Sequence, residues 1–82
     1  MDETGLHLAM TPERLEECLS IVRWSPETLA QALGCDVSLV EAWLTEEAEI
    51  PPKTAAWVDT VAQFMETADG MKPKGLKGKK WP

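Results

Sequence analysis

The side chains that could carry out chemistry are few in this 82-residue sequence, which contains one histidine, two cysteines and fourteen acidic residues. His7, Cys18 and Cys35 are too few to supply a credible zinc site. The adjacent acids Glu16 and Glu17 would point in different directions on a helix, so they do not form a catalytic carboxylate pair. The sequence therefore predicts a protein that is not an enzyme and uses no metal, cofactor or small-molecule substrate.

The two cysteines and the N-terminal residues indicate the cellular compartment. Both cysteines lie in apolar helical patterns, which predicts reduced, buried thiols and no disulfide framework. The chain opens with Asp2 and Glu3 instead of the basic residues of a secretory signal. No stretch approaches the ~20 apolar residues that a membrane-spanning helix needs. We therefore expect a cytoplasmic protein that does not interact with membranes.

Charge is divided sharply between the body of the chain and its C-terminal end. Residues 1–70 contain all fourteen acids and only three bases, so their formal charge is −11. Residues 71–82 contain no acid and carry +5, from Lys72, Lys74, Lys77, Lys79 and Lys80. The composition of this segment, MKPKGLKGKKWP, is typical of a flexible tail. Three roles remain open for it: a solubilising end, an arm that follows phosphates while Trp81 stacks on a base, or a segment that folds back on the acidic body.

Two similar start signals predict the first two helices. Thr11 and Ser25 are each followed by Pro and Glu, a combination of capping residue, first-turn proline and favourable charge. The first helix should end near Arg23, with one apolar face formed by Leu15, Cys18, Leu19 and Val22. The second should cover residues 26–33 and stop at Gly34, because glycine accepts the left-handed conformation common at helix ends.

Two more helices are expected downstream. Asp36 or Ser38 caps the third, and the pair Ser38 and Glu41 favours a capping box. This helix should fade within residues 45–47, and Ile50 should then enter the core. The fourth helix should begin at Pro52 and end at Gly70, with an apolar stripe comprising Trp57, Val58, Val61, Phe64 and Met65. Trp43 of the third helix and Trp57 of the fourth are both predicted to pack in the core.

The segment between the second and third helices has the features of a helix-turn-helix. Packing two helices steeply across a tight turn requires a small inner residue, here Ala30, and a turn glycine, here Gly34. Cys35 supplies a hydrophobe in the turn, and Val40 and Trp43 supply inward residues on the following helix. The predicted fold is therefore an all-α bundle of four to five helices around a central helix-turn-helix. An N-terminal arm (1–10), a domain (11–70) and a basic flexible tail (71–82) make up the chain.

This part of the chain resembles the helix-turn-helix domains of the lambda-repressor/Cro-like family. The run LAQALGC at residues 29–35 is similar to that family's L-A-x-x-L-G-hydrophobe signature, and Val40 matches a buried Ile or Val. The resemblance covers about residues 11–68. It implies a bacterial or phage regulator of transcription that binds DNA as a dimer, with its third helix in the major groove. By position, the base-contacting residues would be Val37, Ser38, Glu41, Ala42 and Thr45.

Those five residues depart from an effective DNA-binding surface. None is Arg, Lys, Asn or Gln, the residues best suited to bidentate contacts with bases. Asp36, Glu46 and Glu47 would repel phosphates, whose neutralisation supplies most of the affinity for DNA. Two hypotheses therefore remain: a DNA-binding regulator assisted by the five tail lysines, or a protein-interaction module that keeps the helix-turn-helix fold without binding DNA. Fold-level analogy favours the first.

Overall fold

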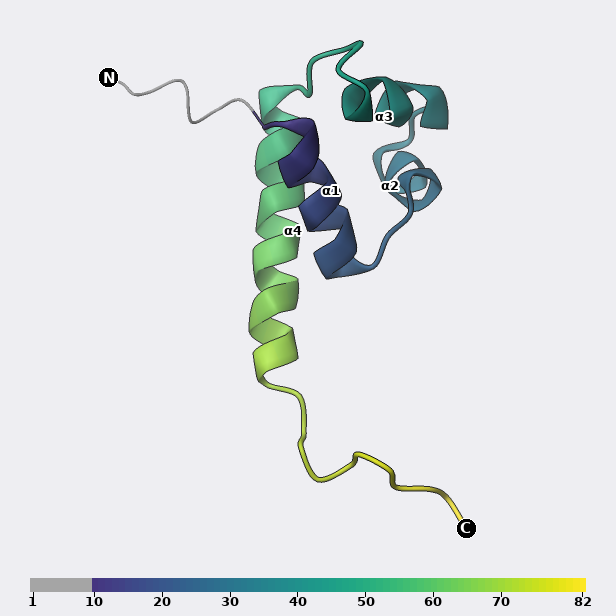
Figure 1. Cartoon of the computed structure of the whole chain (residues 1–82), viewed down its shortest axis with the longest axis vertical. Helices are drawn as coiled ribbons and strands as arrows, with labels where there is room; N and C mark the ends of the chain where they lie inside the picture. Colours follow the sequence, from purple (N-terminus) through teal and green to yellow (C-terminus); the bar gives the residue numbers. More distant parts are fainter. Residues whose placement is uncertain (1–9) are drawn as a thin grey trace, which may run out of the picture.

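The computed structural model describes residues 10–82, and its regular secondary structure over that range consists of four helices, with no strand (Figure 1). The helices are α1 (Pro12–Val22), α2 (Pro26–Leu33), α3 (Val37–Leu44) and α4 (Pro52–Gly70). The all-α prediction is confirmed, and the predicted bounds of the second and fourth helices agree with the structure. The predicted N-terminal arm, apart from Met10, lies outside the described residues.

Local side-chain contacts explain where α1 and α2 begin. The hydroxyl of Thr11 accepts a hydrogen bond from the backbone N–H of Arg14 at 3.1 Å, and that of Ser25 accepts one from Thr28 at 3.1 Å. A proline follows each cap, where its missing N–H costs no helical hydrogen bond. Both predicted helix starts are therefore confirmed.

Left-handed residues end the first two helices. Arg23, at φ 64°, follows α1, and Gly34, at φ 76°, follows α2. The N–H of Gly34 and that of Cys35 both donate to the carbonyl of Ala30, at 2.8 and 3.0 Å. These bonds close α2 and turn the chain into α3 within three residues.

The start of α3 differs from the predicted capping box. Asp36 is the N-cap, and its carboxylate accepts a hydrogen bond from the backbone N–H of Ser38 at 2.9 Å. Of the two predicted caps, Asp36 is therefore confirmed, whereas Ser38 lies inside the first turn and the predicted capping box of Ser38 and Glu41 is wrong. The physical reason is that the carboxylate of Asp36 accepts a hydrogen bond from a backbone N–H that has no partner within the helix. Its negative charge also suits the positive end of the helix dipole.

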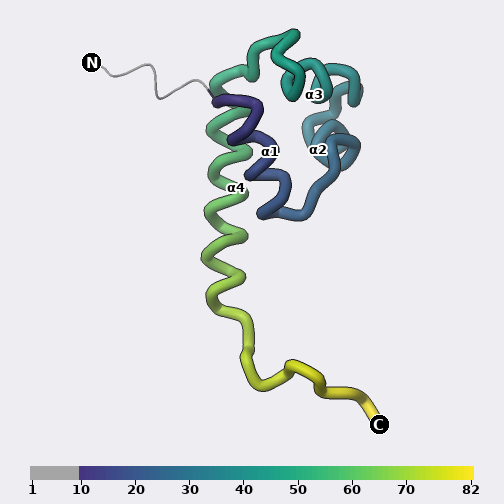
Figure 2. Tube along the Cα trace, in the orientation of Figure 1, coloured from purple at the N-terminus to yellow at the C-terminus, as the bar shows by residue number. Residues whose placement is uncertain are grey.

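The four helices form two packed pairs. α4 lies beside α1 and runs in the same direction, α2 packs on α3, and α3 also contacts α1 (Figures 1 and 2). The core between them contains Leu15, Cys18, Leu19, Val22, Leu29, Ala30, Val40, Trp43, Ile50, Ala55, Val58 and Ala62. The predicted burial of Ala30, Trp43 and Ile50 is confirmed.

The predicted apolar stripe of α4 needs correction. Ala55, Val58 and Ala62 are its buried residues, whereas Trp57 is 40% exposed and Phe64 is 71% exposed. Trp57 instead stands beside Trp24, with ring centroids 6.1 Å apart and planes tilted by 39°. The cause is the side of the helix on which they lie. At about 3.6 residues per turn, Trp57 and Phe64 share a face of α4 that points away from the face of Ala55, Val58 and Ala62, which is the one that packs on α1 (Figure 1).

Candidate nucleic-acid interface

The outward face of α3 contains three exposed predicted contact residues and two that are partly buried. Ser38, Glu41 and Thr45 are exposed, whereas Val37 and Ala42 are half-buried. Val37 packs against the core cluster, so much of its side chain is unavailable to a ligand. The predicted contact surface is thus accessible mainly through one serine hydroxyl, one carboxylate and one threonine.

The accessible threonine is itself engaged with the helix. Its hydroxyl lies 3.1 Å from the carbonyl oxygen of Glu41 and 3.4 Å from that of Ala42, so it donates back to the backbone. Thr45 can still accept a hydrogen bond, whereas its proton is already placed. The carboxylate of Glu41 can only accept, and a cytosine amino group is the base-edge donor that suits it.

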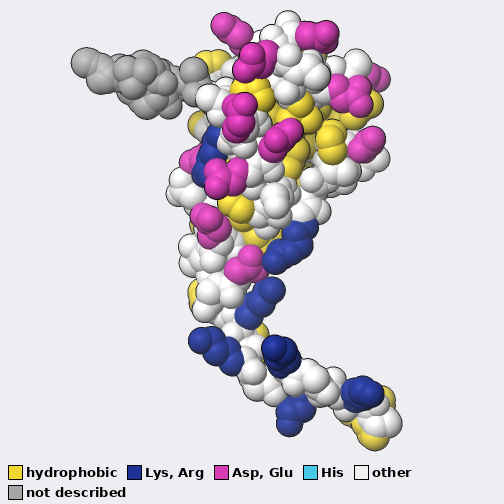
Figure 3. Space-filling view, in the orientation of Figure 1, with side chains coloured by type: hydrophobic (Ala, Val, Ile, Leu, Met, Phe, Trp, Pro, Cys, Tyr) yellow, Lys and Arg dark blue, Asp and Glu magenta, His cyan; other side chains and the backbone are white. Residues whose placement is uncertain are grey.

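Acidic residues surround this face. Asp36 precedes α3, and Glu46, Glu47 and Glu49 follow it, all of them exposed. Hydrogen bonds from Ser38 hold the pKa of Asp36 below its usual value, so this carboxyl stays charged at neutral pH. Figure 3 shows acidic side chains gathered over the end of the molecule that contains α2 and α3. DNA brought to α3 would meet these charges before any base edge.

The five lysines of the tail are at the opposite end of the molecule. Residues 71–82 continue from the far end of α4 and are exposed throughout, while α3 lies near the other end of the long axis (Figures 1 and 2). The described residues extend 53 Å along that axis. The structure therefore does not bring the two halves of the predicted site together. A 12-residue tail can nevertheless span up to about 40 Å when extended.

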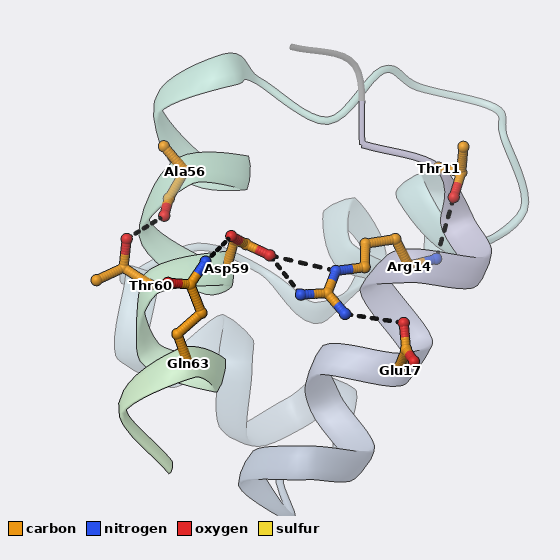
Figure 4. A network of polar contacts seen from close by, with 7 residues as sticks. All are labelled: Thr11, Arg14, Glu17, Ala56, Asp59, Thr60 and Gln63. Atoms are coloured by element: carbon orange, nitrogen blue, oxygen red, sulfur yellow. Dashed lines mark hydrogen bonds and ion pairs between the residues drawn. The ribbon is translucent and has the colours of Figure 1, made fainter. Parts of the chain in front are cut away.

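Two of the three cations in residues 10–70 bind acids of the same chain. The guanidinium of Arg14 donates to Asp59, with Nη2 and Nε at 2.5 and 3.2 Å from Oδ1, and to Glu17 at 2.8 Å (Figure 4). Gln63 donates to the other oxygen of Asp59 at 2.6 Å. Arg23 lies 3.4 Å from Asp69. These ion pairs link the two ends of α1 to α4 and compete with any contact that the arginines could make with phosphates.

This pairing was not predicted from the sequence. Arg14 and Asp59 are separated by 45 positions, and no local motif connects them. The hydrogen bonds from Arg14 lower the pKa of Asp59, and those to Asp59 raise the pKa of Arg14. The pair therefore remains ionised over the physiological range and acts as an electrostatic link between the two helices.

The two thiols differ in accessibility. Cys18 is fully buried and Cys35 is half-buried, and neither forms a disulfide. The predicted burial is confirmed for Cys18. It is wrong for Cys35, which is only half-buried because the turn between α2 and α3 lies at the edge of the core. Burial raises the pKa of the Cys18 thiol, which keeps it protonated and unreactive.

Neither a metal cluster nor a membrane-spanning helix is found where the structure is described. Within residues 10–82, no group of three or more His, Cys, Asp or Glu side chains is placed to bind a metal ion. Over the same range, every helix is too short or too polar to cross a bilayer.

Comparison with known proteins adds no assignment. No family model, no curated protein and no solved structure matches the chain. The geometry of the described residues is accordingly the basis for a functional proposal.

Proposed function

We propose that residues 11–70 form a helix-turn-helix domain of the lambda-repressor/Cro-like type and that the chain binds DNA. Three observations support the fold. A three-residue turn joins α2 to α3, Gly34 within it has a positive φ, and Ala30, with 3% of its surface exposed, lies on the inner side of α2. On α3, Val40 and Trp43 are directed into the core. This is the packing that the family resemblance implies.

The observation that carries the DNA-binding proposal is the exposed outward face of α3. Ser38, Glu41 and Thr45 are all exposed on a helix whose opposite face is anchored by Val40 and Trp43. As the second helix of the helix-turn-helix, α3 can enter the major groove and place its outward residues against base edges. Regulation of transcription is the activity that this arrangement suits.

Affinity in this proposal comes from the tail. The body carries −11 and binds its own arginines, so α3 alone cannot neutralise phosphates. The five lysines of residues 71–82 are exposed, and their own segment contains no acid, although Lys72 lies 3.5 Å from Asp69 at the end of α4. Extended, a tail of this length spans up to about 40 Å, so in this proposal it contacts phosphates outside the groove that α3 occupies.

Salt-dependent binding measurements test the role of the tail. Full-length protein is titrated against labelled mixed-sequence duplex DNA by fluorescence anisotropy at several salt concentrations. A chain with the five tail lysines replaced by glutamine keeps its length but loses its charge. For every lysine that no longer neutralises a phosphate, the magnitude of the log–log salt slope should fall by about 0.9, and affinity for all sequences should fall together. Lys53→Gln, a single lysine of α4 away from the tail, should leave the slope nearly unchanged.

The role of α3 requires a separate measurement. Ser38→Ala and Glu41→Gln should change the preference among duplex sequences while the salt slope stays nearly constant, because base contacts give specificity and phosphate contacts give affinity. If the full-length chain does not bind mixed duplex DNA even at low salt, the DNA-binding proposal is wrong.

A protein-interaction module is the second candidate, and the charge distribution favours it. The exposed residues around α3 are acidic, and the lysines lie at the far end of the molecule (Figure 3). Such a face suits a basic protein partner better than a polyanion. Failure to bind DNA, combined with an intact fold, would support this candidate.

A further inference from the structure

α4 has a second apolar seam besides the one that contacts α1. Trp57, Val61, Phe64 and Ala68 of α4, and Met71 directly after its last residue, follow one another at intervals of four, three, four and three residues. This alternation is the heptad spacing of helices that pair along their length. The seam contains no charged side chain.

The structure leaves this seam uncovered from Phe64 to Met71. Phe64 is 71% exposed, Met71 is 76% exposed and Ala68 is exposed, whereas Val61 is half-buried against the core and Trp57, 40% exposed, packs beside Trp24. In Figure 1, the end of α4 extends past the last turn of α1 and has no other described helix beside it. The other seam, formed by Ala55, Val58 and Ala62, is already buried against the body.

We propose that the second seam binds a second copy of this chain, with the two α4 helices antiparallel and a two-fold axis beside Phe64. The seam is symmetric in sequence about that residue, because Trp57 precedes it by seven positions and Met71 follows it by seven. An antiparallel pair places Trp57 of one copy against Met71 of the other. It also places the small Ala68 near Val61 and brings the two Phe64 rings together. This interface is self-complementary, as a two-fold dimer requires.

Charge selects the antiparallel arrangement over the parallel one. The tail, with +5, leaves α4 after Gly70, and the connection before α4 carries the exposed residues Glu46, Glu47 and Glu49. Antiparallel helices bring the tail of each copy beside the acidic connection of the other. Parallel helices would instead place two tails of +5 together and two bodies of −11 together, which like-charge repulsion disfavours.

Analytical ultracentrifugation of the full chain, without DNA, tests whether the seam forms a dimer, so its outcome is independent of the proposed function. The wild-type chain should form dimers as its concentration rises, and Phe64→Asp should remain monomeric over the same range. Phe64 is mostly exposed, so this substitution should leave the helical circular-dichroism spectrum unchanged. Leu39→Asp is the matched control, because Leu39 is 41% exposed on α3, away from the seam.

Three outcomes would overturn the proposal that this seam forms a dimer interface. They are a wild-type chain that stays monomeric, a Phe64→Asp variant that dimerises as the wild type does, and a Leu39→Asp variant that loses dimerisation equally. Raising the salt concentration should weaken the dimer, because the contacts between tail and connection are exposed and therefore screened.

The orientation of the helices is tested by a distance between spin labels. A nitroxide is attached at Ala56→Cys, an exposed position of α4, on a Cys35→Ser background, while Cys18 is buried and stays unlabelled. Antiparallel pairing about Phe64 separates the two labelled backbones by about 24 Å along the helix axis, from a rise of about 1.5 Å per residue. Parallel pairing brings the labels directly beside each other. A short label-to-label distance would overturn the antiparallel dimer.

Discussion

Gly34 shows how one residue can fix the direction of a following helix. Its φ of 76° lies in the left-handed region, and a Cβ built on it would meet nothing within 4 Å. The need for glycine here is therefore conformational and not a matter of space. In this conformation the N–H of Gly34 donates to the carbonyl oxygens of both Ala30 and Gln31, at 2.8 and 3.2 Å.

Replacing Gly34 by valine should destabilise the fold by about 1–2 kcal/mol, the cost of forcing a side chain into the left-handed region. Gly34→Asn should cost less, because asparagine tolerates that conformation best among the other residues. Chemical denaturation of the two variants and the wild type measures the difference. Equal unfolding midpoints for valine and asparagine would show that the left-handed backbone is not needed.

Asp59 should make the free energy of unfolding depend on pH in the acidic range. Its pKa is lowered in the folded state by Arg14, so the unfolded chain binds the proton more tightly. The stabilisation is complete above the unfolded pKa of about 4 and is lost as the pH falls through the lower folded pKa. Asp59→Asn should cost about 1 kcal/mol or less at neutral pH, because both side chains are about one-third exposed.

Thermal unfolding at a series of pH values measures this effect. The gap between wild type and Asp59→Asn should be constant above pH ~5 and should close on acidification. Glu66→Gln, at an exposed position of the same helix, provides the control and should leave the curve almost unchanged. A gap that persists at the lowest pH would assign the loss to something other than the charge.

At the scale of the elements, the crossing of α2 and α3 depends on a small residue. Ala30 is 3% exposed on the inner side of α2. Ala30→Leu should overpack this contact and destabilise the protein by about 1–3 kcal/mol. Ala32→Leu, at an exposed position of the same helix, should have little effect. Urea unfolding of both variants tests the contact, and equal stability of the two would contradict close packing at Ala30.

Helix bounds were predictable because their signals are local. A capping hydroxyl followed by proline marks Thr11 and Ser25, and a left-handed glycine marks Gly34, so a few neighbouring residues suffice. The exposure of Phe64 was not predictable in the same way. It depends on which side of α4 the other helices cover, which is a relation between helices distant in the sequence. Periodicity reveals an apolar face but not what covers it.

The same limit applies to the candidate site. Residue types correctly indicated that the face of α3 is poor in basic side chains, and Ser38 and Glu41 are exposed as a contact surface requires. The sequence could not show that Arg14 is held by Asp59, because the two residues meet only in the folded chain. Nor could it show that the tail lysines emerge at the far end from α3, because that distance is set by the length and direction of α4 (Figure 1).

At the scale of the whole molecule, the separation of charge along the long axis gives the protein a large electric dipole. The acidic body is at one end and the tail, with +5, is at the other. The lysines also follow the C-terminus of α4, where the helix has its partial negative charge. The electric field of a highly charged surface exerts a torque on this dipole, so the molecule turns before contact is made. A polyanion therefore meets the tail first, and a polycation meets the acidic body first, so the sign of the target selects which end arrives.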